Sequence, residues 1–311
     1  MFSLTLVSRA AATLLLAAAS ADALACSACG CTLNADWATQ GLTSRTGLTA
    51  DLRSGTGRVD RGALALPSDR EIQQHTVNRM GTLTLDYGLT PDWGVTLTLP
   101  WIERRHTTIA PGDTDISSSR SDSPGDARVL ARYTGLSDAQ DWGLQFGLKL
   151  PTGDSHRVEF DAGPQQGQML DRGLQPGTGS TDLLVGAFKF GAVSETVDWF
   201  GQALLQIPVA ADRAFRPGVG ANVTAGVRWR ALEWVVPQAQ INSRVERRET
   251  GSEADTPNSG ASLVYFSPGA TFKTSERTSV YLFGQVPVYQ RVNGYQLEPK
   301  WSVSAGVHAA F

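Results

Sequence analysis

The sequence is poor in the residues that usually mark metal or redox chemistry, and it lacks a long apolar segment after its first thirty positions. Its 311 residues include three cysteines, three methionines and four histidines. The absence of a later run of 18 or more apolar residues excludes a membrane protein built from helices. With 27 basic and 30 acidic residues, the net charge of −3 gives no reason to expect nucleic-acid binding.

The first 25 residues have the features of a secretory signal peptide. Arg9 provides the positive charge, 10–19 form a short apolar segment, and Ala23-Leu24-Ala25 is an A-x-A cleavage site. A transmembrane anchor is disfavoured because the apolar segment is too short to cross a bilayer. We therefore expect a mature chain that begins at Cys26.

The three cysteines all lie at this expected new N-terminus, as Cys26, Cys29 and Cys31. Three thiolates so close together are candidate ligands for a soft metal such as copper(I) or zinc. A disulfide between two of them, with the third free or lipidated, is the alternative. Haem attachment is disfavoured because no histidine follows at the required spacing. Residues 26–41 are thus predicted to be a periplasmic segment, with metal, disulfide and lipid left open.

A strand hairpin dominates the middle of the chain. In 142–150 large apolar side chains alternate with Gly143, Gln145, Gly147 and Lys149, which is the period-2 pattern of a strand with one apolar face. The preceding strand, 126–134, shows the same alternation, and the short turn 137–140 joins the two. Basic residues on the polar face, with short turns and long loops, indicate lipid on one side and a wet lumen on the other.

The same pattern recurs from residue 42 to the last residue, so 42–311 are predicted to form one domain. The fold class is all-β, a transmembrane antiparallel barrel of about twelve strands of the bacterial outer-membrane type. The expected strands are 42–54, 75–90, 93–101, 126–134, 142–150, 181–192, 197–210, 219–231, 233–249, 261–274, 279–291 and 300–311. Long polar loops are expected at 104–124 and 155–179.

Turn length predicts the orientation of this barrel. Turns after even-numbered strands are short and loops after odd-numbered strands are long, which places both termini in the periplasm. Five tryptophans lie beside the short turns and predict an aromatic girdle there: Trp93, Trp142, Trp199, Trp229 and Trp234. Phe311, a terminal aromatic closing the last strand, resembles the signal read by the barrel-assembly machinery.

A family resemblance adds to this interpretation. It rests on Gly125-Asp126 with Arg132-Tyr133, on Leu150-Pro151-Thr152-Gly153-Asp154, and on Gly177 and Gly179 with Asp182. These residues, in the middle third of the chain, resemble the outer-membrane barrels grouped as "MetA-pathway of phenol degradation" proteins. The resemblance implies a channel for aromatic or other hydrophobic compounds. The cysteine-rich start is not part of that family's pattern.

The polar faces of the strands supply the candidate pore-lining residues. They are Arg128, Arg132, Lys149, Gln202, Gln206, Arg228, Arg230, Gln240, Arg244 and Gln285. Acidic residues on the same faces include Asp86, Asp126, Asp182, Asp198 and Glu246. Two interpretations remain open. Either the charges pair across strands and fill a narrow lumen, or they line a selective, anion-leaning pore.

Three functions are therefore weighed. The first is an outer-membrane channel for small solutes, including aromatic or hydrophobic ones, with lipid and solute as partners. The second is a barrel that acts with a periplasmic metal or redox partner through the cysteines. The third is an outer-membrane enzyme, for which Asp154-Ser155-His156 has suitable residue types. Neighbours in sequence rarely reach triad geometry, so no catalytic residue is predicted.

Overall fold

The computed structural model describes residues 46–59, 74–109, 113–211, 214–294 and 296–311. They form thirteen strands and two short 3-10 helices, η2 (Arg172–Leu174) and η3 (Thr256–Asn258). The strands are β1 (Gly47–Val59), β2 (Gln74–Gly88), β3 (Trp93–Thr108), β4 (Ser117–Pro124), β5 (Arg128–Tyr133), β6 (Trp142–Lys149), β7 (Thr181–Ala192), β8 (Val197–Ala210), β9 (Gly220–Trp229), β10 (Val235–Glu246), β11 (Ala261–Lys273), β12 (Thr278–Val292) and β13 (Glu298–Ala310). None of the helices in this described part is long and apolar enough to cross a membrane.

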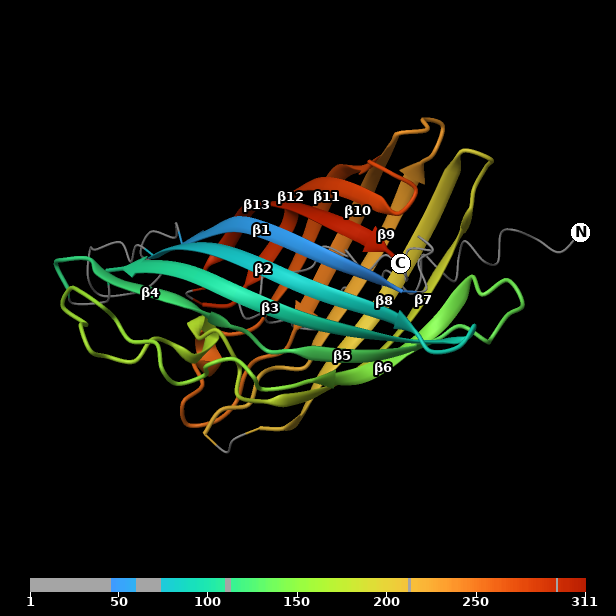
Figure 1. Ribbon diagram of the computed structural model, residues 1–311. Helices are drawn as coiled ribbons and strands as arrows, with labels where there is room; N and C mark the ends of the chain where they lie inside the picture. Colours follow the sequence, from blue (N-terminus) through green and yellow to red (C-terminus); the bar gives the residue numbers. More distant parts are fainter. Residues whose placement is uncertain (1–45, 60–73, 110–112, 212–213, 295) are drawn as a thin grey trace, which may run out of the picture.

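The strands close into an antiparallel barrel (Figure 1). Apart from β4 and β5, which do not pair with each other, each strand pairs with its neighbours in the chain, and β1 pairs with β13 to complete the ring. Strand β3 has two successive partners on one edge: β5 beside its first half and β4 beside its second half. The closed ring therefore contains twelve strands, and β4 is an extension above β5. The predicted fold class and strand number are confirmed.

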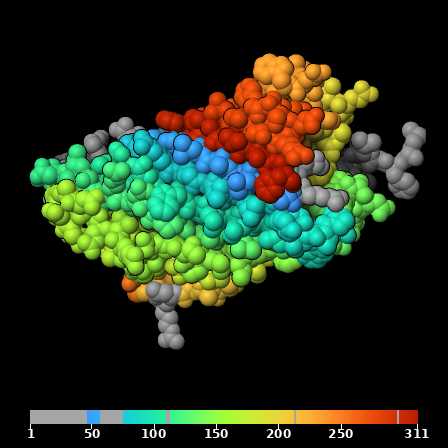
Figure 2. Space-filling view, in the orientation of Figure 1, coloured from blue at the N-terminus to red at the C-terminus, as the bar shows by residue number. Residues whose placement is uncertain are grey.

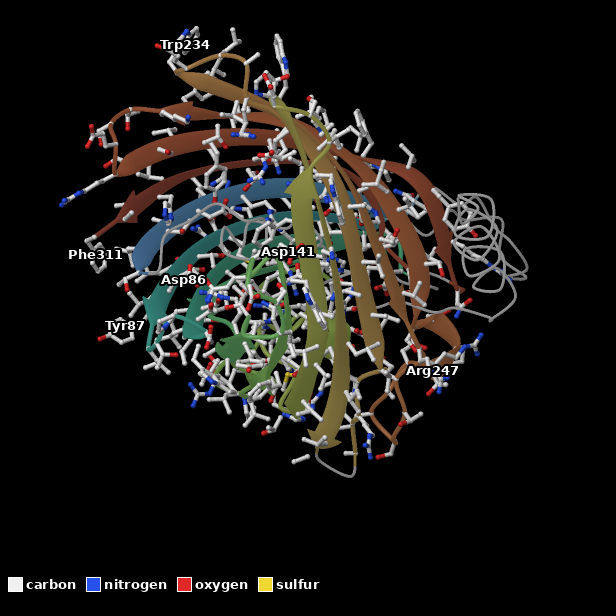
Figure 3. All side chains as sticks on the ribbon, turned by 90° about the vertical axis from the view of Figure 1, so that its right-hand side faces the viewer. Asp86, Tyr87, Asp141, Trp234, Arg247 and Phe311 are labelled. Atoms are coloured by element: carbon white, nitrogen blue, oxygen red, sulfur yellow. The ribbon has the colours of Figure 1, made fainter. Side chains whose placement is uncertain are left out.

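The period-2 alternation sorts side chains between lumen and exterior. On β2, Asp86 is buried (3 % exposed) and Tyr87 is 54 % exposed, and the two side chains point to opposite sides of the sheet (Figure 3). Leu83 and Leu85 are exposed, whereas Thr96 on the neighbouring strand is buried. A water-soluble protein would bury those leucines. The inverted distribution, apolar outside and polar inside, is that of a barrel surrounded by lipid.

The two ends of the barrel differ in their connections. The short turns 89–92, 134–141, 193–196, 230–234 and 274–277 all lie at the right-hand end in Figure 1. The first strand begins and the last strand ends at the same end of the barrel. There the backbone N–H of Phe311 donates to the carbonyl of Thr46 (3.2 Å). Of the five predicted girdle residues, Trp93, Trp229 and Trp234 are exposed and Trp142 and Trp199 are half-buried. The long connections gather at the opposite end.

Two predictions at the loop end of the wall are wrong. A loop was predicted at 104–124, but β3 continues to Thr108 and β4 forms a hairpin with it. The first strand was predicted to end at residue 54, whereas β1 runs to Val59. In β4 the inward residues are the buried serines Ser117, Ser119 and Ser121, and the outward residues are polar too. A strand above the lipid has no apolar face, so hydrophobic periodicity cannot reveal it.

The outward face of β13 provides a test of the lipid contact. Val303 lies in the middle of the strand and is exposed, whereas Ala309 lies near its end. An arginine facing lipid costs about 2–4 kcal/mol at mid-depth and about 0–1 kcal/mol near the interface. We expect Val303→Arg to lower the urea midpoint of the folded barrel in liposomes much more than Ala309→Arg does. Equal effects at the two positions would contradict this membrane placement.

Phe311 is 71 % exposed beyond the end of β13, and its role as an assembly signal stays a prediction. Deletion of Phe311, or its replacement by Asp, should reduce the fraction of barrel that folds in cells. Heat-modifiable migration in gels measures that fraction. A normal folded fraction for the Phe311 deletion would contradict the assignment.

Candidate functional site in the barrel lumen

The barrel encloses a cavity of about 380 Å³ whose lining comes from strands on every side of the ring. Hydroxyl and amide side chains provide much of the wall, among them Thr82, Thr98, Asn222 and Thr224. Apolar side chains lie between them, including Met80, Leu130 and Leu204. Six of the ten predicted pore-lining residues contact this cavity: Arg128, Lys149, Gln202, Gln206, Arg244 and Gln285.

The other four predicted residues lie elsewhere. Arg132 approaches Asp86 at 4.0 Å. Arg228 and Arg230 both approach Asp198, at 3.7 Å and 2.6 Å, and Arg230 follows the last residue of β9 and is half-exposed. Gln240 is fully buried, with 1 % of its surface exposed. None of these four contacts the cavity.

A buried ion cluster occupies the top of β5, β6 and β7. The Lys149 ammonium lies 3.0 Å from Asp126 and 3.1 Å from Asp182. All three side chains are at least nine-tenths buried. Gln206 donates to the second oxygen of Asp182 (2.5 Å), and the Ser180 hydroxyl donates to the first (2.6 Å). A buried lysine between two carboxylates is tolerated only because every charge has a partner.

The same cluster fixes the loop between β6 and β7 to the wall. Asp126 accepts backbone N–H groups from Gly153 (3.1 Å) and Thr178 (3.0 Å), one from each end of that loop. At the crossing, a Cβ added to Gly177 would lie 2.3 Å from the carbonyl oxygen of Gly153, so only glycine fits there. Apart from Arg132-Tyr133, the segments that carry the family resemblance, more than fifty residues apart, thus meet at one attachment point.

This loop, 150–180, is folded over the mouth of the lumen. Arg172, Gly173, Gln175 and other residues near its C-terminal end line the cavity. Arg104 on β3 donates to Asn78 (2.6 Å) and to the carbonyl of Leu174, which ties the loop to the wall. A small apolar core beneath the loop contains Phe160, Leu170, Leu174 and Leu297. The sequence predicted the loop but not its inward position.

Two further loops reach the same mouth. Phe215 and Pro217 from the β8–β9 connection, and Glu249 from the β10–β11 connection, also line the cavity. The Arg172 guanidinium lies over the ring of Phe215, 4.6 Å from its centre, in a cation–π contact. The mouth at the loop end is therefore narrowed by parts of three connections that hold one another.

Two of the predicted pore-lining cations are already neutralised by carboxylates. Arg244 donates two hydrogen bonds to Glu246 (2.9 and 2.5 Å) and one to Asn222 (3.1 Å). Lys149 is bound by its two aspartates. Arg128, at the start of β5, lines the cavity and makes no ion pair or side-chain hydrogen bond with the described residues. Charge pairing thus applies to Lys149 and Arg244, whereas Arg128 is a cation available to a solute.

A serine, a histidine and a carboxylate meet at the outside of the mouth. Ser155 Oγ lies 3.2 Å from His156 Nδ1, and His156 Nε2 lies 3.0 Å from Glu253. The Arg172 guanidinium contacts both ring nitrogens of His156 and lies 3.8 Å from Glu253. A donor on the ring prevents it from accepting the serine proton, which a nucleophilic serine requires. We interpret the group as a link between the 150–180 loop and the β10–β11 loop.

Glu249 is a buried carboxylate at the mouth of the lumen. It lies in the β10–β11 loop and accepts the backbone N–H of Asp255 (3.0 Å). Burial, together with the nearby carboxylates of Asp171, Asp255 and Glu246, raises its pKa from 4.5 to about 7. The mouth therefore gains an unfavourable buried negative charge when the pH rises above neutrality.

Cys26, Cys29 and Cys31 lie outside the described residues, so copper or zinc binding there stays a prediction. The same holds for the signal peptide at 1–25 and for the segment 26–41.

Replacing Lys149 tests the buried ion cluster. Lys149→Met leaves Asp126 and Asp182 buried without a cation, which should cost about 3–5 kcal/mol. Equilibrium unfolding in urea measures the loss. Lys189→Met is the matched control, because Lys189 is more than half exposed and lies 3.5 Å from Asp141, so its loss should cost less than about 1 kcal/mol. Similar losses for the two variants would refute a structural role of the cluster.

The raised pKa of Glu249 predicts a pH-dependent stability with a definite sign. Its contribution is fully present below pH 4.5, the pKa when unfolded, and is lost as the pH rises through about 7. Glu249→Gln stays neutral, so its melting temperature should match the wild type below pH 4.5, exceed it increasingly up to about pH 7, and then differ by a constant amount. Glu195→Gln, in an exposed turn, removes a carboxylate outside the mouth and serves as the comparison variant. A difference between Glu249→Gln and wild type that stays constant from pH 4.5 to about 7 would contradict the shift.

Comparisons with known proteins agree with the fold. No protein-family model and no curated protein sequence matches the chain. An outer membrane channel from Pseudomonas putida F1 is similar in structure, with a TM-score of 0.60 and 14% sequence identity over 90% of this chain and 99% of that one. The transport unit of the autotransporter AIDA-I from Escherichia coli gives a TM-score of 0.51 and 13% identity over 92% of this chain and 95% of that one. The chain thus has the barrel fold of bacterial outer-membrane proteins.

Proposed function

We propose that this protein is an outer-membrane channel for small solutes. The observation that carries the proposal is the 380 Å³ cavity inside a closed barrel whose exterior is apolar. An aqueous cavity is unnecessary for a membrane anchor, and small barrels without a transport role fill their interior with side chains. Similarity to an outer membrane channel from Pseudomonas putida F1 supports the same function by analogy of fold.

The lining favours a small amphipathic solute. The volume falls within the range of pockets that hold drug-sized ligands. Aromatic side chains of Phe215, Tyr265 and Tyr281 face the same space as the threonine hydroxyls, so an aromatic ring with a polar substituent finds both kinds of partner. The resemblance to the "MetA-pathway of phenol degradation" barrels supports this solute class.

The proposed orientation places the long loops outside the cell and both termini in the periplasm. Short periplasmic turns and long external loops are the rule for such barrels. It also puts Phe311 on the side where the barrel-assembly machinery acts.

Single epitope tags test the orientation. A tag within 163–167, an exposed part of the β6–β7 loop, should be detected on intact cells. A tag in the 137–140 turn should be detected only after the outer membrane is permeabilised. The opposite labelling pattern would reverse the barrel while leaving the fold unchanged.

Conductance in planar bilayers tests the channel itself. Wild-type barrel should produce discrete conductance steps. Replacement of 157–175 by a Gly-Ser-Gly linker should enlarge them, because this segment narrows the mouth. Deletion of 113–116 at the tip of the β3–β4 hairpin is the control, since these residues do not line the cavity. If neither the wild type nor the loop replacement conducts while both are folded, the channel proposal fails.

A further inference from the structure

An arginine cluster lies on the outer face of the barrel, at the loop end of β2, β3 and β4. The cluster consists of Arg79, Arg105 and Arg120, one residue from each strand, around Glu103. Register places Arg79, Glu103 and Asp122 in one row across the three strands, with Arg105 and Arg120 in the row above. These strands form the near face in Figure 2.

The cluster begins where the apolar band ends. On β3 the outward residues run from Leu97 and Leu99 to Trp101, and the next outward residue is Glu103. Trp101 is 54 % exposed, and its indole N–H donates to Asp122 (2.5 Å). Tryptophan side chains settle at the level of the lipid headgroups. The arginines are therefore at the height of the headgroups rather than in the hydrocarbon or in bulk water.

One carboxylate is shared by three guanidinium groups. Glu103 lies 3.0 Å from Arg105, 3.2 Å from Arg120 and 3.4 Å from Arg79. Each arginine has five N–H donors, so most donors of the cluster are not used by Glu103. The three side chains are 56 %, 58 % and 55 % exposed, which leaves those donors facing outward.

Stability does not explain three arginines at this place. Exposed ion pairs contribute little to folding, and one arginine would suffice to pair Glu103. Instead, the negative charge of Glu103 reduces the repulsion between the three guanidinium groups, so that they can lie close together. Guanidinium groups bind phosphate oxygens through paired hydrogen bonds, more strongly than they bind water. The arrangement is thus a preformed site for a phosphate group that approaches along the barrel wall.

We propose that the arginine cluster binds the phosphorylated glucosamine headgroup of lipid A in the outer leaflet. Its acyl chains would lie against the apolar band beside Leu99 and Trp101, and its phosphate would reach the arginines one row above. This inference rests on the proposed orientation, which puts the loop end in the outer leaflet. It does not depend on conduction through the lumen.

The test compares two double variants of the full-length barrel in detergent. Arg105→Gln/Arg120→Gln removes two charges from the cluster, and Lys273→Gln/Arg277→Gln removes two exposed charges at the short-turn end. Binding of bis-phosphorylated lipid A is measured by native mass spectrometry. Each basic residue near an anionic lipid surface raises the affinity roughly fivefold. Loss of two should therefore make the cluster variant bind on the order of thirtyfold more weakly than wild type. The control variant should bind as wild type does.

Dephosphorylated lipid A separates phosphate recognition from contact with acyl chains. Wild type should bind it about as weakly as the cluster variant binds the phosphorylated form. Equal wild-type affinity for the two lipids, or equal affinity of the cluster variant and wild type, would overturn the proposal. Heat-modifiable migration verifies folding of each variant, and Arg120→Gln alone replaces the double variant if that one fails to fold. Conductance of the cluster variant should remain normal, so failure of this proposal and of the channel proposal are distinguishable.

Discussion

The structure depends on one constraint, which is that a backbone in lipid must satisfy its own hydrogen bonds. An open sheet would leave one edge unpaired, so β1 must pair with β13 along most of its length. Once the ring is closed, alternation sends every second side chain inward. The polar face of each strand therefore lines the lumen. The chemistry of the lumen is set by closure of the barrel, without any additional structural element.

Closure creates a second constraint, because charges inside the ring are removed from bulk water. Lys149 on β6, Asp182 on β7 and Asp126 just before β5 meet it by forming one cluster. The cluster then uses the spare acceptors of Asp126 to hold both ends of the β6–β7 loop. Apart from Arg132-Tyr133, the segments that carry the family resemblance are thus explained by loop attachment. They say little about which solute passes, whereas the unpaired cation Arg128 does bear on the solute.

Periodicity predicted the fold because lipid enforces it at every second residue of the wall. It failed at β4, where the outward residues are polar as well as the inward serines, and at the end of β1, for the same reason. The inward direction of many lumenal residues was also predictable, since Lys149 and Gln206 simply oppose apolar neighbours. The contacts between lumenal residues were not predictable. Asp126, for example, accepts a hydrogen bond from Thr178, which is 52 positions away in the sequence, and no local pattern reveals such a contact. Arg79, Arg105 and Arg120 were missed because register alone brings them together.

Two of the connections at the mouth, the β6–β7 and β10–β11 loops, are attached with unequal strength. This difference determines where the mouth can open more widely. The β6–β7 loop is attached through fully paired charges and an apolar core. The β10–β11 loop instead contains Glu249, which lies near Asp171, Asp255 and Glu246 and is disfavoured as an anion. Deprotonation adds repulsion to the second loop and none to the Lys149 cluster. Widening of the mouth should therefore begin at the β10–β11 loop, where the link from His156 to Glu253 is exposed and weak.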